Sequence, residues 1–338
     1  MSLSTEIRVA YAEMESIFHH ILLKHSFSKD KAALCARIFA DNSLDGVYTH
    51  GVNRFSRFVQ MVVEKHVLPD QEPTKAAGFG GMEQWNGNLG PGPSNAIFCT
   101  ERAMQLADDS GIACVALANT NHWMRGGTYG WKAAKEGYVF ICWTNTIANM
   151  PAWGAKEARL GNNPIILAVP HDNEAIVLDM AISQFSYGGM EKFAMQQKAL
   201  PVPGGYDETG QITSDPQKVL STKQSLPIGY WKGSGLSLLL DLLATILSGG
   251  KSTFQITEQK TESAVSQIFI AVKLSSLYNS SAINNIINSI IADYHTAAKQ
   301  SASNEILYPG ERVLQARKRN SENGIPVNTK VWDEILAL

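Results

Sequence analysis

A histidine and an arginine lie four residues apart in the segment Tyr48-Thr-His50-Gly-Val-Asn-Arg54. On a helix, side chains at this spacing share one face. Arg54 could then bind a carboxylate through two parallel hydrogen bonds, while His50 gives a proton to an oxygen that becomes an alkoxide. Those two groups suit a 2-oxo acid. A capping or partly buried structural histidine would give the same pattern, so the spacing alone leaves both interpretations open.

A second polar segment, Asn119-Thr-Asn-His-Trp-Met-Arg125, follows an apolar run and precedes two glycines. Paired glycines let a ligand approach the backbone closely, so Asn121, His122 and Arg125 could together bind hydroxyl groups or a carboxylate. Asparagine and glycine also favour ordinary turns, and a structural turn is the alternative.

The sequence lacks the G-x-G-x-x-G spacing of an ordinary Rossmann dinucleotide site. The nearest substitute is Gly229-Tyr-Trp-Lys-Gly-Ser-Gly235, which we expect to open a helix. Backbone N–H groups at a helix start, together with Lys232, would suit a phosphate. Glycines at a helix start also serve tight packing, so this segment alone does not identify a site.

Composition excludes several classes of function. The 29 basic and 31 acidic residues nearly cancel, and the absence of a long basic run argues against nucleic acid as a partner. Zinc-protease, serine-hydrolase and Walker motifs are missing and the histidines form no ligand set, so we predict no metal site. Four scattered cysteines without C-x-x-C spacing indicate buried thiols in a reducing compartment.

The sequence shows no pattern typical of a secretory signal or of a membrane span. Residues 1–13 include acidic side chains and no basic flank before an apolar run. The longest apolar stretch, Leu236 to Leu247, is interrupted by Ser237 and Asp241 and is shorter than the roughly 20 residues that span a bilayer. We therefore predict a cytoplasmic protein without a membrane partner, in which this stretch is a buried core helix.

The elements that must position these residues follow from the spacing of apolar side chains. Helices are predicted from the N-cap Ser28 to residue 42, and at 50–69, 96–110, 236–247, 282–300 and 309–320, with Trp332 and Leu336 as apolar anchors. Strands are predicted at 113–118, 138–144, 165–169, 175–179 and 265–272, the third and fourth as a hairpin, and residues 78–93 and 204–227 as turns and loops.

This alternation of helices and strands predicts an α/β fold. The hairpin favours a mixed or largely antiparallel sheet over a series of βαβ units. A length of 338 residues suggests two or three lobes.

Several segments together resemble one family. Tyr48 to Arg54, Asn119 to Gly127, Gly161 to Pro164, Val177 to Ala181 and Trp231 to Leu236 are similar, in the same order, to signatures of the type-2 malate/L-lactate dehydrogenases. The resemblance covers nearly the whole chain. It implies a non-Rossmann α/β fold with a mixed, largely antiparallel central sheet and helical N- and C-terminal segments, which accounts for the missing fingerprint.

The resemblance also implies an activity. Members of this family transfer hydride between a nicotinamide cofactor and a 2-oxo or 2-hydroxy acid, so it implies NADH, with NADPH possible, and a homodimer whose active site lies near the subunit boundary. Glu83 to Trp85, His122 to Gly127 and Ser266 to Ile270 are most similar to members that reduce a 2-oxo sugar acid.

Two alternatives stay open at this point. One keeps the family but takes malate, lactate or a related 2-hydroxy acid as substrate, since a few lining side chains can redirect specificity. The other, from a different class, is a non-catalytic sugar-acid binding protein that uses Arg54 and Arg125 as carboxylate clamps.

The resemblance assigns roles to particular positions. His50 matches the proton donor, and Arg54, Asn121, His122 and Arg125 are candidates for binding the substrate. The implied cofactor-binding residues are Ala175, Ile176, Val177, Leu178, Asp179, Met180, Ala181, Trp231, Lys232, Gly310, Glu311 and Arg312.

Three domains are expected from the order of these elements. Residues 1–75 with 285–338 would form a helical domain, 76–145 with 226–284 an α/β core, and 146–225 a strand-rich cofactor-binding domain.

Overall fold

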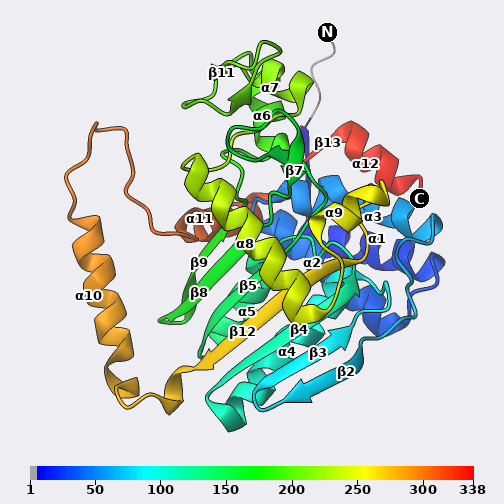
Figure 1. The fold of residues 1–338 in the computed structure, drawn as a ribbon, viewed down its shortest axis with the longest axis vertical. Coiled ribbons are helices and arrows are strands. Elements are labelled where there is room, and N and C mark those ends of the chain that lie inside the picture. Colours follow the sequence, from blue (N-terminus) through cyan, green and yellow to red (C-terminus); the bar gives the residue numbers. More distant parts are fainter. Residues whose placement is uncertain (1–5) are drawn as a thin grey trace.

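The computed structural model describes residues 6–338 and contains a seven-stranded sheet (Figure 1). In spatial order the strands are β2 (Thr74–Phe79), β3 (Met82–Asn86), β4 (Ile112–Thr120), β12 (Val265–Lys273), β5 (Tyr138–Thr144), β8 (Ile165–His171) and β9 (Glu174–Met180). β3 and β4 run parallel, and every other neighbouring pair in this sheet is antiparallel. The predicted mixed, largely antiparallel sheet is therefore confirmed.

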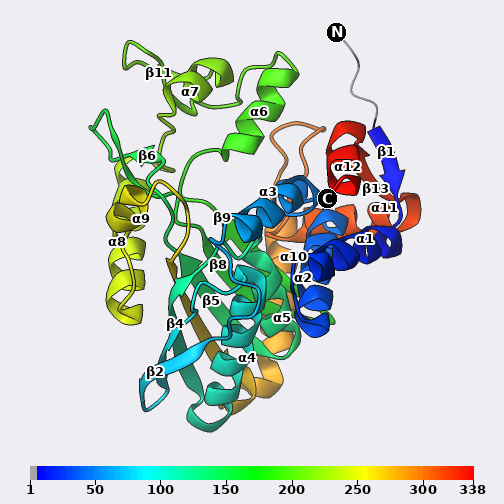
Figure 2. The same cartoon turned by 90° about the vertical axis from the view of Figure 1, so that its right-hand side faces the viewer.

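Helices cover both faces of the sheet (Figure 2). α4 (Gly92–Ser110) and α5 (Gly127–Lys135) pack on one face, and α8 (Trp231–Ser248) packs on the other. Side chains alternate between the two faces of a strand. Along β12, Phe269 accordingly joins the core beneath α4 and α5, while Ile268 joins the core beneath α8.

α8 is buried on one side only, so the prediction of a buried core helix is wrong for its outer face. Gly233, Ser237, Leu240 and Ala244 are buried, and the small side chains among them let the helix lie close to the sheet. The outward apolar side chains are exposed; they are Leu236, Leu238, Leu239, Leu242, Leu243 and Ile246.

The N-terminal helices form a second core. α1 (Tyr11–Lys24), α2 (Lys29–Leu44) and α3 (Val52–Val63) pack with the C-terminal α12 (Thr329–Leu336). The two ends of the described chain also meet in an antiparallel pair of β1 (Glu6–Val9) and β13 (Ile325–Asn328). The predicted N-cap is confirmed, because the Ser28 hydroxyl accepts a hydrogen bond from the Lys31 N–H.

One of the two predicted C-terminal anchors is wrong. Trp332 is buried as predicted, whereas Leu336 is exposed. The neighbouring Ile335 is fully buried instead, because it lies three residues after Trp332 on the inner face of α12.

Two further helices complete the C-terminal part, α10 (Ile283–His295) and α11 (Glu311–Asn323). α11 packs beside α2, whereas α10 contains no buried residue and contacts the β8–β9 hairpin, where Asn288 lies 3.0 Å from His171 Nε2. Its apolar residues Ile286, Ile290 and Tyr294 are exposed.

Sequence reasoning missed several short elements. The region predicted as turn-rich contains most of the β2–β3 hairpin, and the predicted loop 204–227 contains regular structure. The elements not predicted include β1, α5, β13, β6 (Met150–Pro151), β7 (Ala158–Leu160), α6 (Tyr187–Met195), β10 (Gly205–Tyr206), β11 (Ile212–Thr213), α7 (Pro216–Thr222) and α9 (Thr253–Glu258), together with 3-10 turns at Tyr48–His50, Leu274–Ser276 and Ser280–Ala282.

The expected three-domain division stays a prediction, and residues 1–5 of its first domain lie outside the described residues. Within residues 6–338, none of the helices combines the length and apolar character that crossing a membrane requires.

A buried ion cluster joins three of these parts. Asp45, directly after α2, forms an ion pair with Arg125, whose side chain is only 4% exposed. Arg317 of α11 binds the same carboxylate through Nε at 2.6 Å and Nη2 at 3.1 Å, and it also lies over the Trp131 ring. The cluster therefore fixes α2, the turn after β4 and α11 relative to one another.

We predict that Asp45→Asn destabilises the protein strongly, because it removes the negative charge that compensates the buried Arg125. Removing one partner of a buried ion pair costs about 3–5 kcal/mol. The measurement is the free energy of unfolding in urea. Asp333→Asn, at an exposed position of α12, is the matched control and should change that free energy by less than about 0.5 kcal/mol. Equal effects of the two substitutions would contradict the prediction.

Candidate active site

A cavity of about 770 Å³ brings together residues from distant parts of the chain. Its walls come from the α2–α3 corner, the turn after β4, the edge strand β9, the segment 183–188, Glu262 and the start of α11. Of the residues predicted from sequence, His50, Arg54, His122, Arg125, Val177, Leu178, Asp179, Met180, Ala181 and Gly310 line it.

His50 is positioned by its own backbone. It ends a short 3-10 turn, and its carbonyl oxygen accepts a hydrogen bond of 2.9 Å from the Asn42 side chain of α2. The other end of the Asn42 amide accepts from the Thr128 hydroxyl of α5 at 2.7 Å. His50 is therefore tied to the helical layer and, through Thr128, to the helix that covers the sheet.

His50 and Arg54 do not share a continuous helix, contrary to the prediction. Gly51 interrupts it, with φ −116° and ψ −123°. A Cβ on Gly51 would lie 2.2 Å from the Ser43 hydroxyl oxygen, which accepts a hydrogen bond from the Val52 N–H at the start of α3. Only glycine fits there. Both His50 and Arg54 nevertheless line the cavity, so the pairing expected from sequence is realised by a different geometry.

The pKa of His50 depends on opposing neighbours. Burial lowers this pKa below its ordinary value of 6.5, because the charged ring loses water. The Asp179 carboxylate raises the pKa, whereas the positive charges of Arg54 and Arg125 lower it further. Asp179 is thus the acidic group that favours the protonated form of His50.

Asp179 is itself held in place. Its carboxylate accepts a hydrogen bond of 2.8 Å from the Gly127 N–H, and Arg125 Nε lies 3.8 Å away. A Cβ on Gly127 would approach the same carboxylate oxygen to 2.9 Å. The paired glycines after Arg125 therefore let the backbone come close to β9, as their sequence suggested.

His122 stacks on His50, with ring centroids 5.7 Å apart and an interplanar angle of 17°. Burial lowers the pKa of His122 well below 6.5, and the charges of Arg54 and His50 act in the same direction, so the ring is neutral. Its Nδ1 accepts a hydrogen bond of 3.0 Å from the Met124 N–H. A neutral ring that accepts at Nδ1 carries its proton on Nε2, so Nε2 is a hydrogen-bond donor.

Glu262 is a lining residue that sequence reasoning missed. Its carboxylate oxygen Oε1 lies 3.9 Å from His122 Nε2, and both side chains are about a fifth exposed, at 23% and 19%. Burial raises the pKa of Glu262, while Arg54 and the Ile147 N–H lower it. Glu262 lies three residues before β12 in a polar segment, and polar residues next to a strand end are the signal that could have identified it.

Two of the residues predicted to bind the substrate are bonded to other residues of the protein. The Arg125 guanidinium is paired with Asp45, although part of the side chain lines the cavity. Asn121 is not among the lining residues: its amide donates to the Leu89 and Gly90 carbonyl oxygens, and its side-chain oxygen accepts from Ser263. The guanidinium of Arg54 makes no ion pair with residues 6–338 and remains open to a ligand.

The predicted cofactor residues are divided between the cavity and its surroundings. Pro309 and Gly310 lie beside the edge strand β9. The Val177 N–H of this strand donates to the Pro309 carbonyl oxygen at 3.0 Å. Gly310 has φ +100° and touches Val177, which excludes most side chains there. The remaining candidates do not line the cavity; they are Ala175, Ile176, Trp231, Lys232, Glu311 and Arg312.

Three of those remaining candidates have a clear location. Arg312 borders a neighbouring cavity of about 460 Å³ that also includes Gly310. Trp231 and Lys232 begin α8 on the outside of the molecule, where the Trp231 side chain is exposed. The predicted phosphate site at Gly229 to Gly235 is therefore not joined to the main cavity within the described chain.

The residues of the cavity fit a nicotinamide. Apolar side chains of Leu178, Met180 and Ile228 offer surfaces for a flat ring. The Asn162 oxygen accepts from the Thr146 hydroxyl at 3.1 Å, which leaves the N–H groups of its amide as partners for a carboxamide. The volume is large enough for such a ring beside a small acid.

Comparison with known proteins identifies the family of the chain. The family model described as malate/L-lactate dehydrogenase matches residues 9–336. The chain is 44% identical over 333 residues to the 2,3-diketo-L-gulonate reductase of Pasteurella multocida and 42% identical over 334 residues to that of Salmonella paratyphi A, with 98% of this chain and 100% of each relative covered.

Solved structures with the same fold include malate dehydrogenases. The enzyme of Pyrococcus horikoshii superimposes with a TM-score of 0.88 and 26% identity, covering 99% of this chain and 95% of its own. The enzyme of Entamoeba histolytica gives a TM-score of 0.91 at 21% identity, covering 98% and 96%. The fold implied by the resemblance is confirmed, and the alternative of a non-catalytic binding protein is wrong. The chain belongs to the malate/L-lactate dehydrogenase family of NAD(P)-dependent oxidoreductases.

Proposed function

We propose that this protein uses NADH to reduce 2,3-diketo-L-gulonate to 3-keto-L-gulonate. The observation that carries the proposal is that His50 and Arg54 line one cavity, where Arg54 forms no ion pair with any residue of the described range 6–338. Relatives that carry the name 2,3-diketo-L-gulonate reductase at 42–44% identity over the full length support the choice of substrate.

In the proposed mechanism Arg54 binds the substrate carboxylate and so directs the C2 carbonyl group towards His50. The nicotinamide, when bound, supplies the hydride that adds to C2. His50, entering as imidazolium, donates its proton to the carbonyl oxygen, so that the ketone becomes a secondary alcohol and His50 is left neutral. Asp179 stabilises the protonated ring before transfer.

The cofactor and the assembly are part of the proposal. NADH rather than NADPH follows from the resemblance, and Val177 to Ala181 with Gly310 would hold the cofactor. The exposed apolar faces of α8 and α10 support a homodimer, since large apolar patches mark protein interfaces. A cytoplasmic location stays a prediction.

We expect His50→Gln to lower kcat about a hundred- to ten-thousandfold, the range for losing a general acid, while the Kd of NADH stays unchanged. The measurements are steady-state oxidation of NADH and NADH binding followed by fluorescence. His25→Gln, at the end of α1 and away from the cavity, is the control. A wild-type kcat in His50→Gln would refute the assigned role.

The pH profile should report on His50. Reduction needs the protonated ring, so kcat/KM falls as pH rises through its pKa, and because that pKa is lowered from 6.5 the fall should be centred below pH 6.5. Asp179→Asn removes the group that raises the pKa and should move the fall to lower pH. Asp333→Asn should leave the profile unchanged. A shift to higher pH in Asp179→Asn would rule out this electrostatic role.

A panel of 2-oxo acids should separate the proposed substrate from that of a malate dehydrogenase. Oxaloacetate needs a second cation, but Arg125 is paired with Asp45 and Glu262 adds negative charge. We expect kcat/KM with 2,3-diketo-L-gulonate to exceed that with oxaloacetate or pyruvate by about tenfold or more. Preference for oxaloacetate would favour the malate alternative.

A further inference from the structure

The His122 Nε2 and Glu262 Oε1 atoms have the spacing of a hydrogen-bonding site for a single oxygen atom. At 3.9 Å the two polar atoms are too far apart for a direct hydrogen bond. They are close enough, however, for one oxygen atom to lie within hydrogen-bonding distance of both, at about 2.8 Å from each. Both side chains line the main cavity, so that oxygen can belong to a substrate.

The two atoms also differ in kind. His122 Nε2 carries the proton, because Nδ1 is occupied by the Met124 N–H, so it donates. Glu262 Oε1 accepts. A hydroxyl group both accepts and donates, and therefore satisfies both partners, whereas a carboxylate or ketone oxygen has no proton to donate to Glu262 Oε1.

We propose that His122 and Glu262 together recognise a hydroxyl group on the carbon chain of the substrate. Glu262 is then a specificity-determining residue for polyhydroxylated 2-oxo acids. This inference rests on the proposed function, because it assigns a substrate feature within the same cavity. The stacking of His122 on His50 puts the hydroxyl site next to the carbonyl group that is reduced.

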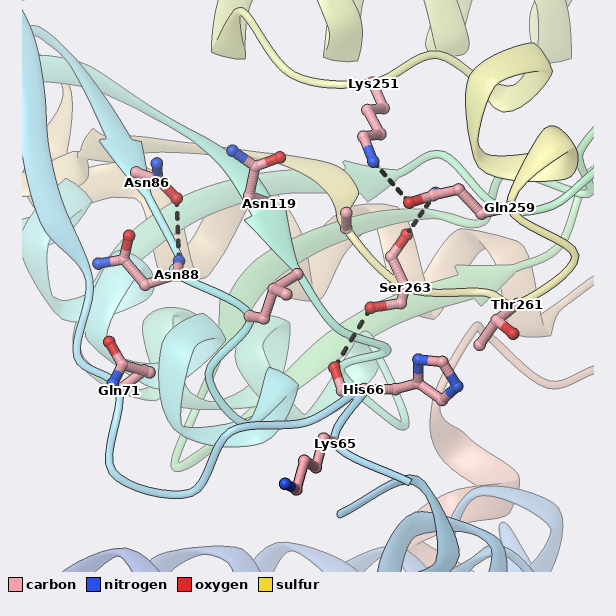
Figure 3. A pocket seen from close by; sticks show the side chains of 12 residues that line it. Lys65, His66, Gln71, Asn86, Asn88, Asn119, Lys251, Gln259, Thr261 and Ser263 are labelled. Atoms are coloured by element: carbon pink, nitrogen blue, oxygen red, sulfur yellow. Dashed lines mark hydrogen bonds between the residues drawn. The ribbon is translucent and has the colours of Figure 1, made fainter. Parts of the chain in front are cut away.

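The residues on either side of Glu262 line a second cavity of about 560 Å³, and Figure 3 shows Thr261 and Ser263 among its lining side chains. The Ser263 hydroxyl donates to the Asn121 side chain at 2.8 Å and lies 3.3 Å from the His66 carbonyl oxygen. The flanking residue is thus anchored, and Asn121 acts through Ser263 as a positioning residue for Glu262.

Substitution of Glu262 provides the test. Glu262→Met keeps the side-chain length but removes the acceptor, whereas Glu262→Gln keeps an acceptor oxygen. Two substrates of equal chain length are compared: 2,3-diketo-L-gulonate, which carries hydroxyl groups, and 2-oxohexanoate, which carries none. Glu258→Gln, at an exposed position of the adjacent α9, is the control.

We expect Glu262→Met to lower kcat/KM with 2,3-diketo-L-gulonate by about ten- to a hundredfold and to change it with 2-oxohexanoate by less than about twofold. Glu262→Gln should recover most of the loss. An equal fall of kcat/KM with both substrates would show a merely structural role and overturn the inference. Unchanged kcat/KM values with both substrates would overturn it as well.

The two proposals fail in different ways. If the wild-type protein oxidises NADH with 2-oxohexanoate but not with 2,3-diketo-L-gulonate, the proposed substrate is wrong and the inference falls with it. If the wild-type protein prefers 2,3-diketo-L-gulonate and Glu262→Met keeps that preference, the proposed function stands and only the inference is overturned.

Discussion

The site depends on the two ion pairs of the Asp45 carboxylate, because they join arginines from distant segments of the chain. Arg125 comes from the turn after β4 and Arg317 from α11, and the charge of Arg125 is too deeply buried to remain unpaired. The segments fixed in this way carry His50, His122 and Gly310, which all line one cavity. The position of the reacting groups therefore follows from compensating buried charge.

In the proposed mechanism, electrostatic coupling links substrate binding at Arg54 to proton donation by His50. Arg54 lowers the pKa of His50 in the free protein. A bound carboxylate would offset that positive charge, so occupation of Arg54 favours the protonated ring at the moment when its proton is needed. In that mechanism Arg54, which binds the substrate, thus also controls the pKa of His50. The Asp179 carboxylate, held by the Gly127 N–H, raises the pKa of His50 and does not depend on the substrate carboxylate.

Local patterns revealed much of the fold and of the site, since a strand or a cap depends on neighbouring residues. The Ser28 cap and strand β5 lie where the sequence predicted them. A local signal could have marked Glu262 as a candidate, but its approach to His122 could not be predicted in this way. The two residues meet because β12 runs antiparallel to β4, with Val265 opposite Thr120, and pairing between distant strands is not visible locally. The outer face of α8 was misjudged for a similar reason, because apolar residues alone do not say how many sides of a helix are covered.

The contact between Asp45 and Arg317 joins residues 272 positions apart. Closing so long a loop costs chain entropy that only a nearly complete set of native contacts can repay, and contacts of this range form slowly. A growing chain emerging from the ribosome cannot complete the core of its first three helices early, because Trp332 and Ile335 of α12 belong to the same core. Native packing of the helices next to His50 therefore requires the last helices of the chain.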